Sequence, residues 1–508
     1  MSRTRNSAWN LAAGLVYALA SAAASLLAAP LLLRWLGPER LGAYRVLTDW
    51  IGYLSLFEMG LGGALMAALA CRIGQGNHAA VKRMLAAGLR GYCRVALAQL
   101  AAGIALVAIL PYLISPNHLS GSELRAACAI ALLPLVFTPL LVFRALAEAR
   151  QRGYVNWLLL SAQVLVMTGL SLLAARLGWG LTGQGAAFAA AQVPALLALA
   201  WDGVRAYPLL YGLWKAAPDQ EDRRALWGLS WPAFVHGLTD RIGLVSDNIV
   251  IAWMLGPAAV VPFFLTQQLA ALAQFLLRGL GQATWAGLAE LYARGDEAGL
   301  RTRLLELTGM VSGLGLAALP AIAAYNRYFV ELWVGQDAYA GEAVTALACF
   351  NVLLWAVYAL WGWALLGTGH IRLWMPFAVL STLVNVVVSL LGTATLGVIG
   401  PLLGTTTALL LITSWALPRA LHRVFGIPPR RLWRAALAPL RWGLPYAAAL
   451  RAIAGYYPPE GWLEFFAVMA SGSALGLALW WRFSLGSEER SEWRARLRNV
   501  LGFILSAL

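Results

Sequence analysis

Apolar runs long enough to cross a bilayer recur along the whole chain. A hydrocarbon core of roughly 30 Å needs about 20 consecutive apolar residues in a helix. Of the 508 residues, 60% are hydrophobic and 12% are charged, whereas soluble proteins average about 25% charged residues. A soluble globular protein is therefore excluded, and the sequence predicts an all-α polytopic membrane protein.

Windows of about 20 residues predict about fourteen transmembrane helices. The first run follows Arg3 and Arg5, as a secretory signal would, but it continues to Leu33, so we expect it to be retained as a span. The predicted spans are 8–34, 46–70, 93–114, 124–143, 155–175, 181–203, 228–255, 260–289, 304–324, 343–366, 373–393, 397–418, 436–454 and 462–481.

The distribution of basic residues predicts the orientation of these spans. When the spans alternate across the membrane, most of the 38 Lys and Arg fall on the side of the amino terminus, and the cluster from Arg419 to Arg441 contributes most. Because basic loops stay in the cytoplasm, we expect both termini there. Residues 205–226 would form a cytoplasmic linker and residues 484–508 an amphipathic tail on the membrane surface. The Arg419–Arg441 cluster is expected to contact anionic membrane lipid.

Cysteine, histidine and glycine patterns argue against metal and nucleotide chemistry. The four cysteines form no CxxC pair, the five histidines no HExxH motif, and no GxxxxGK[ST] loop is present. We therefore expect no metal and no cofactor. The net charge of +15 arises from short basic clusters between apolar runs, so nucleic acid is not an expected partner.

The chain contains an internal repeat at a constant offset of 219 residues, as between Leu36 and Leu255. Segment 31–86 aligns with segment 250–305 without a gap, and both contain a Leu-Gly-Pro turn and a Gly-Leu-Gly step. With six spans each, both halves run in the same sense across the membrane. We therefore predict a six-helix lobe over residues 1–204, a second over 227–425, and an appended helix pair over 426–483.

Charged and amide side chains inside the spans are candidate functional residues, because an ionisable group in lipid is costly unless it pairs or faces a cavity. Asp240 and Asp247 share one face of their predicted helix, and three glutamines with Arg278 form a polar stripe on the next span. The candidate substrate-binding residues are Arg278, Arg241, Asp240, Asp247, Gln274, Gln282, Gln267, Glu58, Arg45 and Asp49.

Structural roles for the same residues stay open. Asp240 or Asp247 would pair with Arg241 or Arg278 to fix two helices, whereas the functional alternative is a water-filled cavity in which Arg278 attracts an anionic head group. Glu58 suits an inter-helix hydrogen bond as well as a transport role. Arg45 and Asp49, four residues apart, are expected to form a local ion pair.

Several motifs follow one another along roughly residues 1–425. They are Arg5 and Asn6, LGPERLGAYRVLTDW, YLSLFEMGLGGAL, SDNIVIAWMLGP from Ser246, FVELWVGQDAYAG from Phe329, and LLGTGHIR ending at Arg372. In their order and spacing they resemble the polysaccharide and O-antigen flippases of the multidrug, oligosaccharidyl-lipid and polysaccharide exporter superfamily. The resemblance implies a V-shaped fold of two lobes, like that of multidrug exporters of the MATE type, with a central cationic cavity and alternating access.

The resemblance also implies a substrate. It would be an undecaprenyl-pyrophosphate-linked oligosaccharide, moved to the outer leaflet of a bacterial inner membrane for lipopolysaccharide O-antigen, capsule or exopolysaccharide synthesis. A coupling ion (H⁺ or Na⁺) and a polysaccharide polymerase are the further partners it suggests.

Two other functions remain as alternatives. A MATE-type cation-coupled multidrug antiporter usually carries carboxylates from its first span onward, and Ala8–Leu33 has none, although Asp240 and Asp247 would serve. A membrane-embedded polysaccharide polymerase or glycosyltransferase needs acid, base or metal-binding groups on sizeable loops. The expected outer loops are short, so we expect a transporter and not an enzyme.

Overall fold

The computed structural model describes the backbone of residues 3–114, 119–207, 230–486 and 490–491, with single residues 216, 220, 226 and 494. Side chains are described within these ranges except at residues 3–8, 11, 206, 230–237, 240, 244 and 245. All regular secondary structure in this part of the chain is helical, as the sequence predicts. The expected linker at 205–226 and the tail at 484–508 lie largely outside the described residues.

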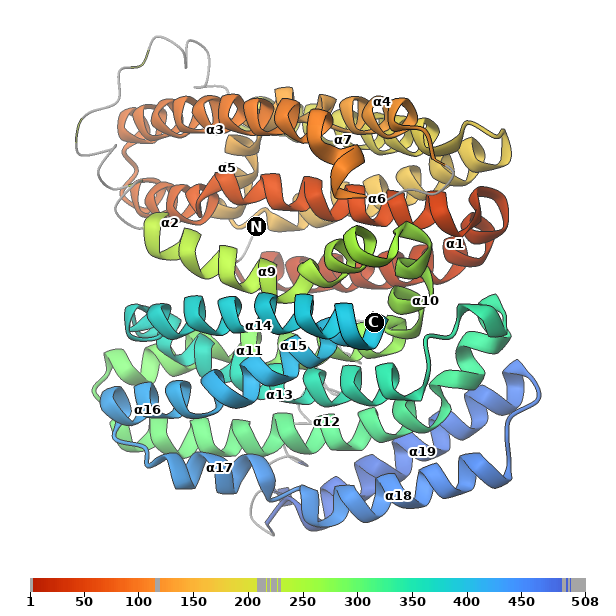
Figure 1. Ribbon diagram of the computed structural model, residues 1–508. Coiled ribbons are helices and arrows are strands. Elements are labelled where there is room, and N and C mark those ends of the chain that lie inside the picture. Colours follow the sequence, from red (N-terminus) through yellow and green to blue (C-terminus); the bar gives the residue numbers. More distant parts are fainter. Residues whose placement is uncertain are drawn as a thin grey trace. The chain divides into compact units, whose positions relative to one another are not determined.

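The chain divides into two compact units (Figure 1). The first comprises residues 1–261 and 393–398, and the second comprises residues 262–392 and 399–508. The predicted lobes divide at 205–226 instead, because the repeat places α9 at the start of the second half. The packing of α9 on α1 groups it with the first unit.

The first unit is built from long helices and short 3-10 turns. Its elements are α1 (Arg3–Leu54), η1 (Ser55–Glu58), α2 (Leu61–Gly74), α3 (His78–Leu113), α4 (Gly121–Ala131), η2 (Leu133–Leu141), α5 (Val142–Ala149), α6 (Gly153–Arg176), α7 (Gly180–Ala206), α9 (Ser230–Leu255) and η5 (Pro257–Ala259). Its core lies where α2, α3 and α5 meet, around the fully buried Leu65, Leu69, Met84 and Leu85.

Except for residues 393–398 at the end of α14 and in η8, which belong to the first unit, the second unit begins within α10 and contains the remaining helices. They are α10 (Val260–Thr266), α11 (Gln268–Ala293), α12 (Glu297–Val334), η6 (Gln336–Ala338), α13 (Glu342–Gly367), η7 (Ile371–Leu373), α14 (Met375–Leu396), η8 (Gly397–Ile399), α15 (Gly400–Ala408), the π-helix η9 (Leu409–Thr413), α16 (Ser414–Phe425), α17 (Pro429–Leu437), α18 (Leu440–Tyr456) and α19 (Trp462–Phe483). Its most buried helix is α12, which packs against α11, α13, α17, α18 and α19.

Helix α1 turns back on itself at Gly37, which has φ 77° and ψ 167°. Glycine adopts this conformation readily because it has no Cβ, and Pro38 starts the following run without needing an N–H partner. Figure 1 shows α1 as two helical runs joined at this turn. The predicted spans 8–34 and 46–70 accordingly begin in separate runs of one 52-residue helix.

Nine helices of the described chain are long and apolar enough to cross a membrane, or ten if the bent pair α10 and α11 forms one span. Two of the nine, Ala12–Glu58 with 47 residues and Met375–Phe425 with 51 residues, exceed twice the length of a single crossing. Large apolar side chains such as Leu19, Ile104 and Leu463 are 70–86% exposed, which suits a lipid environment. The protein is a multi-pass membrane protein.

The repeat seen in the sequence recurs in the backbone. Gly256 has φ 89° and ψ 161°, close to the values of Gly37 at the equivalent position. Asn77 caps α3, and Asp296, its equivalent, caps α12; each side chain accepts a hydrogen bond from the backbone N–H three residues further on. The same turn and the same helix start are therefore built twice.

The structural repeat extends beyond the aligned sequence. Gly178 and Gly397, separated by the same offset, have φ values of 74° and 69° between consecutive helices. The Gly-Leu-Gly steps differ, since Gly60 has φ 71° at the start of α2 whereas Gly279 lies within α11. Helix α11 therefore runs unbroken where the first half has a turn.

Candidate functional site

The predicted site residues divide between the two units. Arg45 and Asp49 lie on α1, Glu58 ends η1, and Arg241 and Asp247 lie on α9. In the second unit, Gln267 lies between α10 and α11, and Gln274, Arg278 and Gln282 lie on α11. The side chains of Asp240 and of nearby His236 are outside the described residues, so the role of Asp240 stays a prediction.

Asp49 connects the second run of α1 to α9. It is 5% exposed, and its Oδ2 accepts a hydrogen bond of 2.7 Å from Asn248 Nδ2, although 199 residues separate the two. Arg45 Nε lies 3.8 Å from the same oxygen, which confirms the local ion pair. The Arg45 side chain is about half exposed, so a partly solvated cation neutralises the buried carboxylate of Asp49.

Arg241 of α9 contacts α1 at Gly52. A Cβ at residue 52 would lie 1.6 Å from Arg241 Nη2, so the guanidinium occupies the space that a larger residue would take. Arg241 Nε is buried and has no hydrogen-bond partner among the described residues. A buried donor of this kind is costly unless an acceptor such as a water molecule satisfies it.

Asp247 brings a second carboxylate within electrostatic range of Asp49. Its Oδ1 is buried without a hydrogen-bond partner in the described part of the chain. The charge of Asp49 acts electrostatically on Asp247. The hydroxyl group of Tyr53 lies within electrostatic range of both carboxylates and of Arg241. The set formed by Arg45, Asp49, Tyr53, Arg241, Asp247 and Asn248 is called the polar cluster below.

The polar cluster combines two kinds of binding chemistry. A guanidinium presents several donors in a fixed plane and binds phosphate groups in a bidentate manner. Two adjacent carboxylates can take up a proton or a monovalent cation, because their negative charges repel each other. Within the described residues, no group of three His, Cys, Asp or Glu side chains is arranged to hold a metal ion.

Glu58 makes an inter-helix hydrogen bond, which confirms the structural one of its two expected roles. Tyr92 of α3 donates to Glu58 Oε1 at 2.6 Å. Gly62 leaves room for this pair, because a Cβ there would lie 2.6 Å from the same oxygen. The contact secures the break between η1 and α2, where Met59 and Gly60 have positive φ values.

The residues of the expected polar stripe lie on α11 or directly before it. Gln267 precedes α11, and its carbonyl accepts a hydrogen bond of 2.8 Å from the backbone N–H of Ala271, as in a helical turn. The bend of 57° lies between α10 and α11, and the side chain of Gln267 donates to the carbonyl of Phe263 at 3.4 Å. Gln274 and Arg278 are partly buried and Gln282 is exposed. Their role in substrate binding stays a prediction.

Arg278 lies against the face of Trp355 on α13, with its Cζ 5.7 Å from the ring centroid. The guanidinium and the aromatic ring attract each other, which helps to hold the partly buried cation in place. The role of Arg278 as a substrate contact stays a prediction. Its neighbour Trp355 carries no charge and was not among the predicted residues.

Uncharged polar side chains also form hydrogen bonds inside the protein, and the pattern of charged residues does not predict them. Asn326 of α12 donates to the carbonyl of Thr266 at 2.8 Å and to Thr345 Oγ1 at 3.0 Å. Gln99 of α3 donates to the carbonyl of Leu54 at 3.0 Å, beside the break between α1 and α2. Isolated Asn and Gln within apolar runs are the signal that identifies such contacts.

Moving Arg241 is expected to impair function without unfolding the protein. Gly52→Ala would push the guanidinium aside, and this is tolerable because the clashing atoms are the end of a flexible side chain. Loss of one well-placed charged contact is worth about 1.4 kcal/mol or more, so we expect a decrease of about tenfold in transport rate. The measurement is initial transport rate in reconstituted vesicles.

Gly14→Ala is the matched control for this variant. It lies on the same helix, and its Cβ would meet only Trp157 at 3.9 Å, an ordinary contact. Both variants should elute as folded protein, and Gly14→Ala should transport normally. Equal rates for the two variants would show that the position of Arg241 does not matter.

Comparison with known proteins assigns the family and the fold. The model of the family described as "Polysaccharide biosynthesis protein" matches residues 4–286, more than half of the chain. A lipid II flippase MurJ structure in an inward closed conformation has a TM-score of 0.67 at 13% identity, covering 92% of this chain and 99% of that one.

Structures of exporters show the same fold. An inward-facing multidrug resistance MATE family transporter of the MOP superfamily has a TM-score of 0.60 at 17% identity, covering 86% of this chain and 96% of that one. MATE in the bent conformation has a TM-score of 0.55 at 18% identity, with 89% and 98% covered. No curated protein sequence matches the chain.

These matches confirm the resemblance seen in the sequence motifs. The likeness to solved structures establishes the fold, and the family match extends over α1 to α9 and most of α11. The structures named above that share the fold are described as a flippase and as MATE transporters. The chain therefore belongs to the polysaccharide biosynthesis protein family and has the fold of the flippases and exporters of the MOP superfamily.

Proposed function

We propose that the protein flips an undecaprenyl-pyrophosphate-linked oligosaccharide from the cytoplasmic to the outer leaflet of a bacterial inner membrane. The observation that carries this proposal is the partly buried Arg241 of α9, whose Nε is buried and has no hydrogen-bond partner among the described residues. A pyrophosphate head group supplies the acceptors and the negative charge that such a donor needs. Membership of a polysaccharide biosynthesis family directs the proposal to a glycan-bearing lipid.

The proposed topology has fourteen spans and two six-helix lobes that alternate in access to the substrate. The two helical segments of 47 and 51 residues each supply two spans, and the repeated backbone geometry supports two lobes of the same orientation. Helices α18 and α19 form the appended pair. Because basic loops stay in the cytoplasm, both termini are cytoplasmic in this topology. The transported lipid serves the synthesis of O-antigen, capsule or exopolysaccharide.

A MATE-type cation-coupled antiporter is the second candidate. The observation that favours it is the proximity of Asp49 and Asp247, because paired carboxylates are a means of coupling transport to H⁺ or Na⁺. The same pair also fits a flippase that uses an ion gradient, and a polysaccharide polymerase would be a suitable partner. The enzyme alternative has no support from the fold.

Reconstitution separates the two transporters. Full-length protein in vesicles is supplied with a fluorescent pyrophosphate-linked lipid oligosaccharide, and a membrane-impermeant quencher reports the fraction in the outer leaflet. We expect lipid movement that needs the protein and no accumulation of a cationic dye under a proton or sodium gradient. Dye accumulation without lipid movement would instead establish the antiporter.

A further inference from the structure

Two of the spans in the first unit contain a stretch that is not α-helical. The second predicted span changes after Leu54 from α1 into the 3-10 turn η1, and Met59 and Gly60 follow with φ values of 51° and 71° before α2 begins. The fourth span contains η2, a 3-10 helix of nine residues between α4 and α5. A 3-10 stretch of that length is uncommon, and inside a longer helix it often marks a hinge.

The sequence accounts for both stretches. Pro134 and Pro139 lie in η2, and each lacks the backbone N–H that an α-helical hydrogen bond would use. Before α2, Met59 has a left-handed conformation that costs energy in a residue with a Cβ, whereas Gly60 adopts it readily. We therefore expect these two spans to bend most easily at η1 and η2.

Gln99 of α3 joins the two stretches. Its side chain is 3% exposed, its Nε2 donates to the carbonyl of Leu54 at 3.0 Å, and its Oε1 accepts a hydrogen bond of 2.9 Å from Thr138 Oγ1 in η2. Seven residues earlier, on the same face of α3, Tyr92 donates to Glu58 at the end of η1. Helix α3 therefore contacts both ends of η1, and one buried glutamine connects η1 to η2.

The second half of the chain lacks these features at the equivalent positions, all of which the structure describes. The offset of 219 residues pairs α3 with α12 and the fourth span with α13. The four polar residues of the first half are replaced by apolar ones, and the equivalents of Glu58, Tyr92, Gln99 and Thr138 are Leu277, Val311, Ala318 and Val357. These lie inside the regular helices α11, α12 and α13, and the bend of the second half comes earlier, between α10 and α11. The polar contacts and both breaks are therefore present together or absent together.

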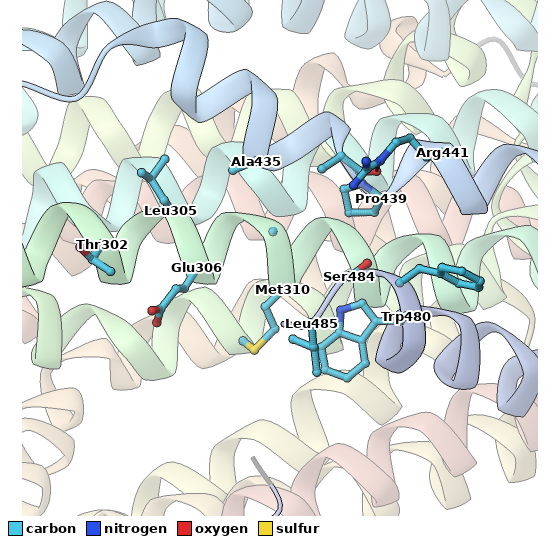
Figure 2. Close-up of a pocket in the computed structure, with 13 residues that line it drawn as sticks. Thr302, Leu305, Glu306, Met310, Ala435, Pro439, Arg441, Trp480, Ser484 and Leu485 are labelled. Carbon is cyan, nitrogen blue, oxygen red and sulfur yellow. Dashed lines mark hydrogen bonds between the residues drawn. The ribbon is translucent and has the colours of Figure 1, made fainter. Parts of the chain in front are cut away.

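The second half supports the same level of its third span in another way. A Cβ at Gly476 of α19 would lie 2.4 Å from the carbonyl oxygen of Ala317 on α12, and Tyr446 of α18 donates to that carbonyl at 3.2 Å. Figure 2 shows Met310 of α12 and Trp480 of α19 among the residues that line a cavity of about 450 Å³ beside this contact. Helix packing therefore fixes α12 where a polar contact between two breaks fixes α3.

The helices that follow the two stretches form one body. Helices α2 and α5 pack against each other and against the beginning of α3, around the buried Leu65, Leu69 and Leu146. Such a body can tilt only if both of its connections, η1 and η2, bend at the same time. Helix α3 runs past both stretches with 36 residues and no break, and helices of this length curve gently without one.

We propose that η1 and η2 act as one hinge of the first unit, and that Gln99 makes them open together. Opening breaks the two contacts of Gln99 and tilts α2 and α5 as one body, while a few residues absorb the change in φ and ψ. The hinge belongs to the first half alone, so the two halves contribute differently to the alternating access proposed above. The opening is a property of the fold and does not depend on which molecule is transported.

Hydrogen/deuterium exchange followed by mass spectrometry tests the proposal on purified full-length protein in lipid nanodiscs. Backbone exchange reports how often a segment opens. Gln99→Leu removes both contacts of the amide and leaves the Leu54 carbonyl and the Thr138 hydroxyl without this partner. Residues 55–60 and 135–141 should then exchange about tenfold faster, because the loss of a partner of a buried polar group shifts the opening equilibrium by about that factor.

Variants that remove a single contact decide whether the two stretches are coupled. Thr138→Val puts into η2 the residue that the second half has at this position, and it removes the hydroxyl that donates to Gln99. Tyr92→Phe removes the hydroxyl that donates to Glu58. Each variant should speed exchange by about fivefold, and by the same factor in both stretches. An effect confined to the stretch that carries the lost contact would overturn the proposal.

Gln184 provides the matched control. It is a buried glutamine of the same unit that joins the regular helices α6 and α7, where Ser171 donates to its Oε1 and its Nε2 donates to the carbonyl of Ser171 at 3.0 Å. Gln184→Leu should speed exchange in α6 and α7 and leave residues 55–60 and 135–141 unchanged. Equal acceleration of those two ranges would show that any lost polar contact loosens the whole unit, and the proposal would fail. The readout is exchange alone, so it stays interpretable if the flippase proposal fails.

Discussion

Replacing Arg278 by alanine is expected to lower the rate of lipid-linked oligosaccharide flipping by about a hundredfold or more. Loss of one partner of a desolvated charged contact costs about 2–5 kcal/mol, and tenfold corresponds to about 1.4 kcal/mol. Arg278 is partly buried and rests on Trp355, and the role we expect for its guanidinium is to bind the pyrophosphate group. Initial flipping rates in reconstituted vesicles measure the effect.

Two variants on the same residue and helix make the result specific. Arg278→Lys keeps the charge but loses the planar guanidinium, so we expect an intermediate rate. Arg294→Ala removes an exposed arginine near the end of α11 that pairs with Glu290 and should leave the rate unchanged. Full activity of Arg278→Ala in folded protein would remove Arg278 from the site.

The largest expected effect on stability is that of Gly42→Ala. A Cβ at residue 42 would lie 1.8 Å from the carbonyl oxygen of Pro257, so α1 could not approach η5 as closely. The clashing atom belongs to the backbone and cannot move aside as a side chain can. Overpacking of this kind costs about 3 kcal/mol, a large part of the roughly 5–15 kcal/mol of a typical protein.

The measurement for Gly42→Ala is the thermal unfolding midpoint in detergent, with the yield of monodisperse protein as a second readout. Gly63→Ala on α2 is the control, since nothing lies within 4 Å of the added methyl group. Alanine also favours the helix by up to about 1 kcal/mol, so the control should unfold at an equal or higher temperature. Equal midpoints for the two variants would show that the contact with Pro257 is not tight.

The sequence predicts those features that depend on local pattern. The Leu-Gly-Pro turns recur because each needs a glycine with positive φ before a proline, and the structure has that geometry at Gly37 and Gly256. Arg45 and Asp49 form an ion pair and are four residues apart in the sequence. Helical periodicity alone places two such side chains on one face of a helix. The all-helical membrane class follows from the apolar runs.

Local sequence patterns do not predict contacts between segments that are distant in the sequence. The hydrogen bond of Asn248 to Asp49 and the position of Arg241 above Gly52 depend on how α9 packs against α1. The bend of 57° between α10 and α11 cannot be read from a helical period either, because the period assumes an unbroken helix.

Deleting the gene tests the central claim most directly. Lipids are extracted from the deletion strain, and a membrane-impermeant enzyme applied to intact spheroplasts reports which leaflet holds the lipid-linked oligosaccharide. The account predicts that a complete oligosaccharide on undecaprenyl pyrophosphate accumulates facing the cytoplasm while the surface polymer is lost, and the mass of the glycan then identifies the substrate. Normal arrival of that lipid at the outer leaflet in the deletion strain would contradict the flippase.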